Sequence, residues 1–160
     1  MANDPVAQRL RAIGCHASGG TGLHGHSVIR LAMFGWSGPR GGYLADRIAG
    51  LRRHGCNVKA NVSSTGGHVV RTLRAADVPV RSASFDRNGN GTIDLYGHTK
   101  YMLLSGRYQG VSTWNVWTGS ANWSDVSFNN DETTVRIPRR PAYRRYLHNF
   151  NRLWLRARQL

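Results

Sequence analysis

Two apolar runs in the second half of the chain constrain the fold more than any other feature of the sequence. The runs cover residues 101–104 and 111–118, and a polar segment with two glycines, residues 105–110, separates them. Two β-rich runs joined by a glycine-bearing turn predict an antiparallel hairpin. If Ser105 faces Val111, the register places His98 opposite Thr118. Because the first run is apolar on both faces, we expect its strand to be buried.

Polar side chains gather where this hairpin opens. His98 and Lys100 point to one side of their strand because side chains alternate along a strand, and Ser120 and Asn122 follow the second run. A lysine on a buried strand is costly unless an anion meets its charge, and a phosphate would meet it well. A plainer explanation exists, since a lone histidine is often a core residue and Gly-Ser-Ala-Asn is ordinary turn chemistry. The coincidence of all four residues favours a phosphate site.

The ordered motif around these residues resembles that of the phospholipase D superfamily. It consists of His-x-Lys at 98–100, Gly-Ser-x-Asn at 119–122 and an acid, Glu132. The resemblance implies a phospholipase D-like fold and phosphodiester hydrolysis through a phosphohistidine intermediate, with no cofactor required. The family usually has an aspartate where this chain has Ser105, at a position generally considered structural.

The resemblance also implies a role for each matching residue. His98 would be the nucleophile, or the matching acid in a paired site, and Glu132 would orient a histidine. Lys100 and Asn122 would hold phosphate oxygens, and Ser120 would hydrogen-bond within the phosphate site. The catalytic residues carried over are therefore His98, Lys100 and Glu132, and the phosphate-binding residues are Lys100, Ser120 and Asn122.

The charge of the chain indicates anionic partners. Of its 160 residues, 22 are basic and 8 are acidic, which gives a net charge of +14. Such a balance favours nucleic acid, an anionic membrane surface or phosphorylated substrates. Lys59 and Lys100 are the only lysines in the sequence, and the remaining basic residues are arginines. One of the two lysines therefore falls within the motif, although codon bias explains part of the arginine excess.

The cysteines and the N-terminus leave the compartment open. Cys15 and Cys56 lack metal-ligand spacing, and they form either one disulfide or two buried thiols. No apolar run approaches transmembrane length, and no signal-peptide core follows the first residues. We expect a cytoplasmic protein if the chain is complete, and secretion is compatible with a fragment.

The order of apolar segments predicts an α/β fold. We expect a mixed, largely parallel β-sheet flanked by helices on both faces, because strands and helices alternate before the hairpin. Residues 1–27 are interpreted as an N-terminal helix and loop, and residues 28–160 as a single phospholipase D-like catalytic domain. The expected strands are 28–34, 57–62, 78–82, the hairpin and 133–137, and the expected helices are 6–13, 42–54, about 67–76 and 142–158.

A polar segment before the motif matches part of a calcium-binding loop. Oxygen-bearing residues stand at the first, third, fifth and ninth positions of the loop pattern, and Gly91 stands at the sixth. The twelfth position should be a glutamate and is Gly97. The alternative is a polar Asn-Gly turn between strands. If calcium binds, it is a structural ion, and its ligands would be Asp86, Asn88, Asn90 and Asp94.

A single motif copy makes a prediction about assembly. The family chemistry needs two imidazoles, so we expect a homodimer with the active site at the two-fold interface. The chain is otherwise the C-terminal half of a two-motif protein. The expected substrate is a phosphodiester, with nucleic acid ahead of phospholipid, and the alternative is a non-catalytic nucleic-acid-binding module. The helix at 142–158 has a basic side that is either solvated or in contact with phosphates.

Overall fold

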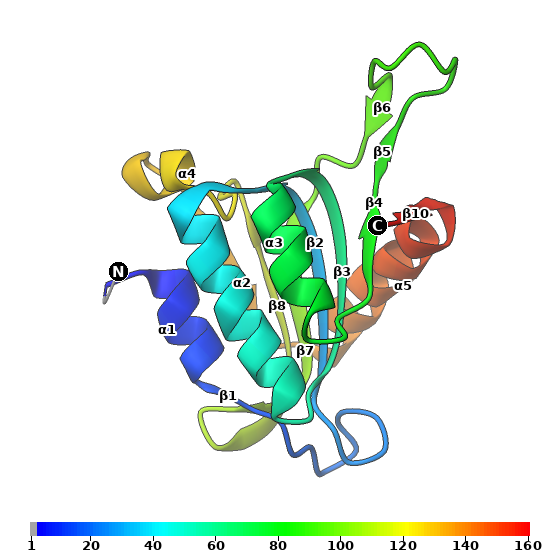
Figure 1. The fold of residues 1–160 in the computed structure, drawn as a ribbon. Helices are drawn as coiled ribbons and strands as arrows, with labels where there is room; N and C mark the ends of the chain where they lie inside the picture. The colour runs from blue at the N-terminus through cyan, green and yellow to red at the C-terminus, as the bar shows by residue number, and fades with distance from the viewer. Residues whose placement is uncertain (1–2) are drawn as a thin grey trace.

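Alternating strands and helices form the parallel centre of the sheet in the computed structural model, which describes residues 3–160 (Figure 1). Strands β2, β3 and β4 pair in parallel in that order. Helices connect them, as right-handed crossovers require for parallel neighbours. The elements are β2 (Val28–Trp36), α2 (Gly38–Arg53), β3 (Asn57–Thr65), α3 (Gly67–Arg74) and β4 (Val80–Ser82).

Antiparallel strands complete the sheet on both sides. The predicted hairpin, β7 (Lys100–Tyr108) and β8 (Val111–Gly119), pairs with β2, and β9 (Thr134–Ile137) pairs with β8. Within residues 3–160 the sheet has eight strands in the order β10-β4-β3-β2-β7-β8-β9, with β1 beside β7. The sheet is mixed, as predicted, but "largely parallel" was wrong. Only the β2–β3 and β3–β4 pairs of this sheet are parallel, and the remaining pairs are antiparallel. The two short additions are β1 (Ile13–Gly14) and β10 (Arg158–Gln159).

The register predicted for the hairpin was wrong by three residues. The turn lies at Gln109 and Gly110, whose φ values of 49° and 79° are typical of a tight type I′ turn. Thr118 therefore faces Tyr101 rather than His98. Gly106, which the sequence suggested as a turn residue, instead lies against Ser27, and a Cβ there would collide with that side chain. The longer hairpin brings residues 119–122 alongside 98–100.

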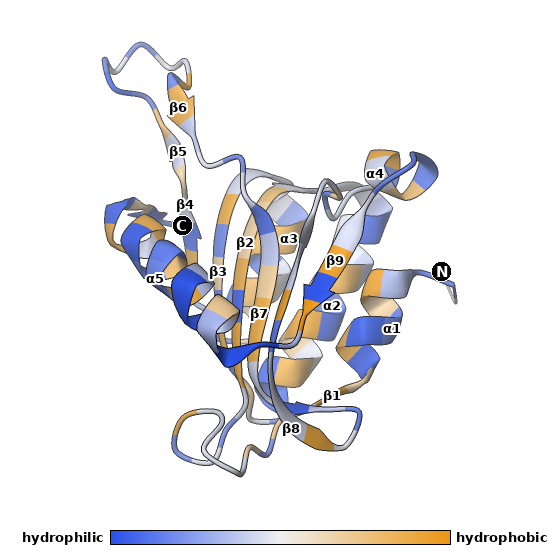
Figure 2. Cartoon of the chain, turned by 180° about the vertical axis from the view of Figure 1, so that it is seen from behind, coloured by the Kyte–Doolittle hydropathy of each residue, from blue (hydrophilic) through white to orange (hydrophobic). Residues whose placement is uncertain are grey.

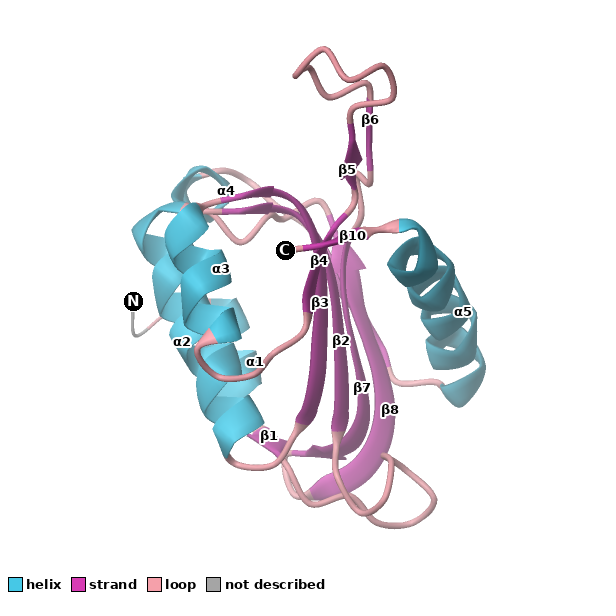
Figure 3. Ribbon diagram, turned by 45° about the vertical axis from the view of Figure 1, so that its right-hand side comes forward, coloured by secondary structure: helices cyan, strands magenta, loops and turns pink. Residues whose placement is uncertain are grey.

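Helices cover both faces of the sheet, as predicted (Figure 3). Helices α1 (Pro5–Arg11), α2 and α3 lie on one face and α5 (Arg140–Arg156) on the other. The first face holds the larger core, which includes Leu10 of α1 and Ile48 of α2. The second core joins Phe150 of α5 to Leu103 of β7. Figure 2 shows the central strands β2 and β7 mainly in the hydrophobic colour.

Smaller elements surround this body. The short hairpin of β5 (Ser84–Phe85) and β6 (Leu95–Tyr96) projects from the sheet, and α4 (Asp125–Asn129) lies near the amino end of α2 (Figure 1). Cys15 and Cys56 form a disulfide across 41 positions of sequence. A cross-link of this kind typically contributes about 2–4 kcal/mol. In the part of the chain that the structure describes, no helix is long and apolar enough to cross a bilayer.

Candidate active site

The His-x-Lys motif lies where β7 begins, beside the carboxyl end of β2. Lys100 pairs in register with Met33, close to the last residues of β2. Its Nζ atom lies 3.0 Å from Nε2 of His98. Phe34 contacts both groups, since its ring meets the His98 ring edge-on at 4.4 Å and lies 5.3 Å from the Lys100 ammonium. The imidazole is exposed and the lysine is half-buried.

The Gly-Ser-Ala-Asn segment leaves β8 next to this pair. The hydroxyl of Ser120 hydrogen-bonds to a carboxylate oxygen of Glu132 and accepts a bond of 3.0 Å from the Thr133 amide. The Ser120 amide donates to the Thr133 carbonyl at 3.0 Å. These bonds join the segment to the start of β9. The structure thus brings Glu132 to Ser120, and the orientation of a histidine by Glu132 stays a prediction.

Asn122 is held against the end of β2 by a glycine. The Gly35 amide donates to Oδ1 of Asn122 at 3.0 Å. A Cβ on Gly35 would lie 2.9 Å from Cγ of Asn122, so a side chain there would push the asparagine away. With its oxygen engaged, Asn122 has its NH₂ group to offer a phosphate. Gly35 was not predicted as a site residue, although a glycine directly after an apolar run is a signal of close backbone approach.

Arg40 of α2 donates hydrogen bonds to the backbone around Asn122. Its Nη1 atom donates to the backbone carbonyls of Asn122 and Ser124 at 2.9 and 3.1 Å. Its Nε and Nη2 atoms donate to the carboxylate of Asp4 at 2.7 and 3.1 Å. The Arg40 side chain is 5% exposed and the Asp4 side chain 1% exposed. A planar guanidinium suits this fork-like pairing. Arg40 was not predicted as a site residue, because its partners are distant in sequence.

The charges of the site affect one another. Burial lowers the pKa of Lys100, and the negative charge of Glu132 opposes that shift. Hydrogen bonds from Ser120 and Ser127 lower the pKa of Glu132, and the charge of Lys100 adds to this. Glu132 is therefore ionised at neutral pH. The site combines an exposed imidazole, an ammonium, an amide donor and a carboxylate, which is a set suited to binding and transferring a phosphoryl group.

Ser105, at the position where the resembled family usually has aspartate, lies away from these groups. It pairs with Val28 in the middle of the sheet, whereas Lys100 pairs with Met33. Five residues of strand separate Ser105 from Lys100 by roughly 17 Å. Its hydroxyl accepts a bond of 2.8 Å from the Gly22 amide, which attaches the loop after β1 to the sheet. Ser105 thus has a structural contact and is too distant to touch a phosphate at His98.

The motif residues lie on an open surface rather than in an enclosed cavity. His98 and Ser120 are exposed. A cavity of about 470 Å³ lies between α1 and α2, lined by residues such as Arg11, Cys15 and His54. It is at the other end of the sheet, because β1, which contributes to its lining, pairs with Tyr108 at the far end of β7. The open site leaves room for a large substrate or a second protein surface.

The calcium-like loop forms the tip of the projecting hairpin. Asp86 accepts bonds from the amides of Gly89 and Gly91, both at 2.7 Å, and Asp94 accepts from the amide of Arg87 at 2.8 Å. Backbone N–H groups within the loop also bond to Asn88 and Asn90. Over residues 3–160, no three His, Cys, Asp or Glu side chains are placed to share a metal ion. Calcium binding at this loop stays a prediction.

Comparisons with known proteins agree with this fold. A family model described as "Cardiolipin synthase, PLD-like domain" matches residues 29–154. No curated protein matches the chain. The fold is similar to that of a phospholipase D family member, Nuc from Salmonella typhimurium, with 18% identity, a TM-score of 0.65, and coverage of 97% of this chain and 88% of that one. NucT from Helicobacter pylori is 17% identical, with a TM-score of 0.61 and coverage of 83% and 82%. Because the family model spans most of the sequence, the chain belongs to the phospholipase D-like family.

Proposed function

We propose that this protein is a phosphodiesterase of the phospholipase D type that hydrolyses P–O bonds in nucleic acid. The observation that supports it most strongly is the convergence of His98, Lys100, Ser120, Asn122 and Glu132 at one end of the sheet. These residues come from separate segments, so an accident of local turn chemistry does not explain their meeting.

The first step forms a covalent bond to histidine. Neutral His98 attacks phosphorus through Nε2, the P–N bond forms, and the P–O bond to the leaving group breaks. The leaving oxygen takes a proton from a second, protonated imidazole. Histidine suits both roles because its ordinary pKa lies near neutrality. Lys100 and the Asn122 NH₂ group stabilise the charge on the phosphoryl oxygens.

The second step returns the enzyme to its starting state. Water attacks phosphorus, and the P–N bond breaks to release a phosphomonoester and His98. The second imidazole, now neutral, takes the proton of that water. We propose that this imidazole is His98 of a second copy of the chain, placed by a two-fold axis through the open site. No metal takes part in either step.

The open surface at the motif and the positive charge of the chain together favour nucleic acid as the substrate. The motif lies on an open surface that admits a polymer, and the chain carries a net charge of +14. A phospholipid headgroup is the second candidate, and the description of the matching family as cardiolipin synthase favours it. The two are distinguished by comparing cleavage of a DNA oligonucleotide with headgroup release from phosphatidylglycerol vesicles.

The test is hydrolysis of bis(p-nitrophenyl) phosphate in EDTA, with the His98→Ala variant beside it and the oligomeric state measured on the same sample. We expect metal-independent turnover by a dimer, and we expect the variant to lose this turnover. When the wild-type reaction is quenched without acid, the peptide that contains His98 should carry a phosphoryl group. Turnover that survives the substitution would exclude His98 as the nucleophile. An inactive monomer would indicate half of a two-motif protein, and an inactive dimer that binds DNA would indicate a binding module.

A further inference from the structure

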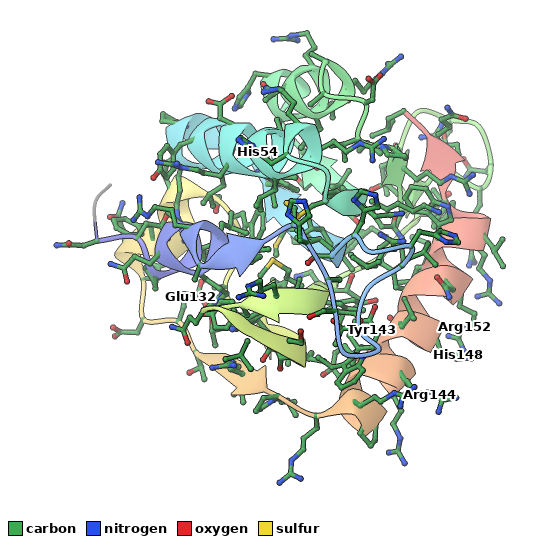
Figure 4. All side chains as sticks on the ribbon, turned by 90° about the horizontal axis from the view of Figure 1, so that it is seen from below. His54, Glu132, Tyr143, Arg144, His148 and Arg152 are labelled. Carbon is green, nitrogen blue, oxygen red and sulfur yellow. A yellow bond between two sulfur atoms is a disulfide. The ribbon has the colours of Figure 1, made fainter. Side chains whose placement is uncertain are left out.

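A row of basic side chains follows the outer surface of α5. Its members stand four residues apart, and residues four apart are neighbours on a helix surface. All five are exposed. We call this row the basic ridge, and it consists of Arg140, Arg144, His148, Arg152 and Arg156. Figure 4 labels three of them, Arg144, His148 and Arg152, along the outer side of the helix. The sixteen steps from first to last advance about 24 Å along the helix axis, and the row winds about 160° around the helix over that length.

The fold itself gains little from the centre of the basic ridge, whereas the Arg140 guanidinium at its start lies 5.1 Å from the centre of the Trp114 ring. The opposite side of α5 does the packing, with Tyr143 and Phe150 buried in the second core. Like charges four residues apart destabilise a helix, and Arg140 in the first turn opposes the helix dipole. Residues 140–156 contain no Asp or Glu. Among residues 3–160 the recorded ion pair is Arg40 with Asp4, so no carboxylate neutralises the ridge.

Positive charge extends beyond the carboxyl end of the ridge. The indole of Trp154 lies between two cations, with the Arg81 guanidinium at 4.5 Å and the Lys59 ammonium at 5.3 Å. Arg81 also donates to the Trp154 carbonyl at 2.7 Å, which fixes it beside α5. Burial lowers the pKa of Lys59, and the charges of Arg30 and Arg81 lower it further. This end of the helix therefore concentrates positive charge, which would favour a bound anion.

We propose that the basic ridge is a docking surface for the phosphate backbone of nucleic acid, separate from the His98 site. This inference rests on the proposed function, since it supplies the polymer substrate with a second contact. Guanidinium groups bind phosphates by paired hydrogen bonds, and a row of about 24 Å matches roughly seven nucleotides of one strand. The ridge lies on α5, across the sheet from α1, α2 and α3 (Figure 3). It contributes affinity and leaves the chemical step unchanged.

The burial of α5 argues for nucleic acid over a membrane. A helix that lies on a bilayer inserts an exposed apolar face. The apolar face of α5 is instead occupied by the sheet, and Leu155, at 81% exposed, is the one large apolar side chain on its outer surface in the described residues. Binding through the ridge is therefore electrostatic, as contacts to a nucleic-acid backbone are.

The experiment compares two double variants of equal charge in a His98→Ala background, which we expect to bind DNA without cutting it. Arg144→Gln/Arg152→Gln removes the centre of the ridge, and Arg71→Gln/Arg74→Gln removes two exposed arginines of α3 on the other face of the sheet. The dissociation constant of a labelled DNA duplex is measured against NaCl concentration. The ridge variant should bind about 10-fold more weakly and lose roughly 1.8 from the slope of log K against log salt. The α3 variant should match the parent.

Equal weakening by both double variants, or an unchanged slope in the ridge variant, would overturn the docking surface. Lost binding to phosphatidylglycerol vesicles with retained DNA binding would also overturn it, in favour of a membrane. On the wild-type background, the ridge variant should hydrolyse bis(p-nitrophenyl) phosphate at the wild-type rate. If the wild type itself does not turn over but ridge-dependent DNA binding persists, the docking surface stands and only the proposed catalysis fails.

Discussion

Gly35 is a residue on whose small size the candidate site depends. Its backbone amide bonds to Asn122, and a Cβ would lie 2.9 Å from Cγ of that side chain. Gly35→Ala should therefore displace the Asn122 amide, which we propose binds phosphate, and lower kcat/KM for bis(p-nitrophenyl) phosphate by about 100-fold. Gly50→Ala is the matched control, because a Cβ there meets nothing within 4 Å. Equal activity in the two variants would show that the placement of Asn122 does not matter.

Glu132 should keep the ammonium of Lys100 protonated to higher pH. Burial lowers the pKa of the lysine, and the carboxylate of Glu132 opposes this. Glu132→Gln removes that opposition, so Lys100 should lose its proton at lower pH, which an NMR titration of the Lys100 side chain measures. Asp131→Asn, on the exposed neighbour, should leave the titration of Lys100 in place. A Lys100 titration that does not move in Glu132→Gln would show that the two charges do not interact.

The sequence predicted which motif residues lie close together, but it did not predict the hydrogen bonds that position Asn122. His98, Lys100 and Ser120 were found because the order and spacing of the motif are visible along the chain. Gly35 and Arg40 were not found, because their bonds to Asn122 join segments 87 and 82 residues apart. Such contacts depend on which strands become neighbours, and this information appears only after the sheet order is known.

At the scale of elements, hydrophobic patterns predicted the main strands and helices but not the hairpin register. Either Gly106 or Gly110 could have been the turn residue of the hairpin. Gly110 has the φ of 79° that a tight turn requires, whereas Gly106 is needed where Ser27 approaches the strand. Both uses of glycine look the same in a sequence. The outer strand β10 was also missed, because two residues of pairing carry no periodic signal.

The Asp4–Arg40 pair connects α1 to the segment that holds Asn122, and its strength should depend on pH. Burial alone would raise the pKa of Asp4, but the hydrogen bonds and charge of Arg40 lower it overall. The stabilisation is thus present above the ordinary aspartate pKa and is lost as pH falls through the lowered value. Asp4→Asn should cost about 3 kcal/mol at pH 7, while an asparagine still caps the helix.

Chemical denaturation between pH 7 and pH 2 measures this effect. The stability difference between wild type and Asp4→Asn should shrink as the pH falls, because the wild-type carboxyl becomes protonated. Asp46→Asn, on an exposed position of α2, is the control and should leave stability unchanged. A difference between wild type and Asp4→Asn that stays constant down to pH 2 would exclude the ion pair as its cause.

For the whole molecule, the proposed chemistry makes the dimer the unit of activity. One chain places one His-x-Lys pair on an open surface, and each site needs two imidazoles. In an equal mixture of wild type and His98→Ala whose subunits have exchanged, about one quarter of the dimers hold two intact histidines. The exchanged mixture should then have about a quarter of the activity of wild type at the same total protein concentration. The mixture before exchange should have about half of that activity. If exchange between subunits is verified and half of the activity still remains, each chain works alone, and the second imidazole must come from within it.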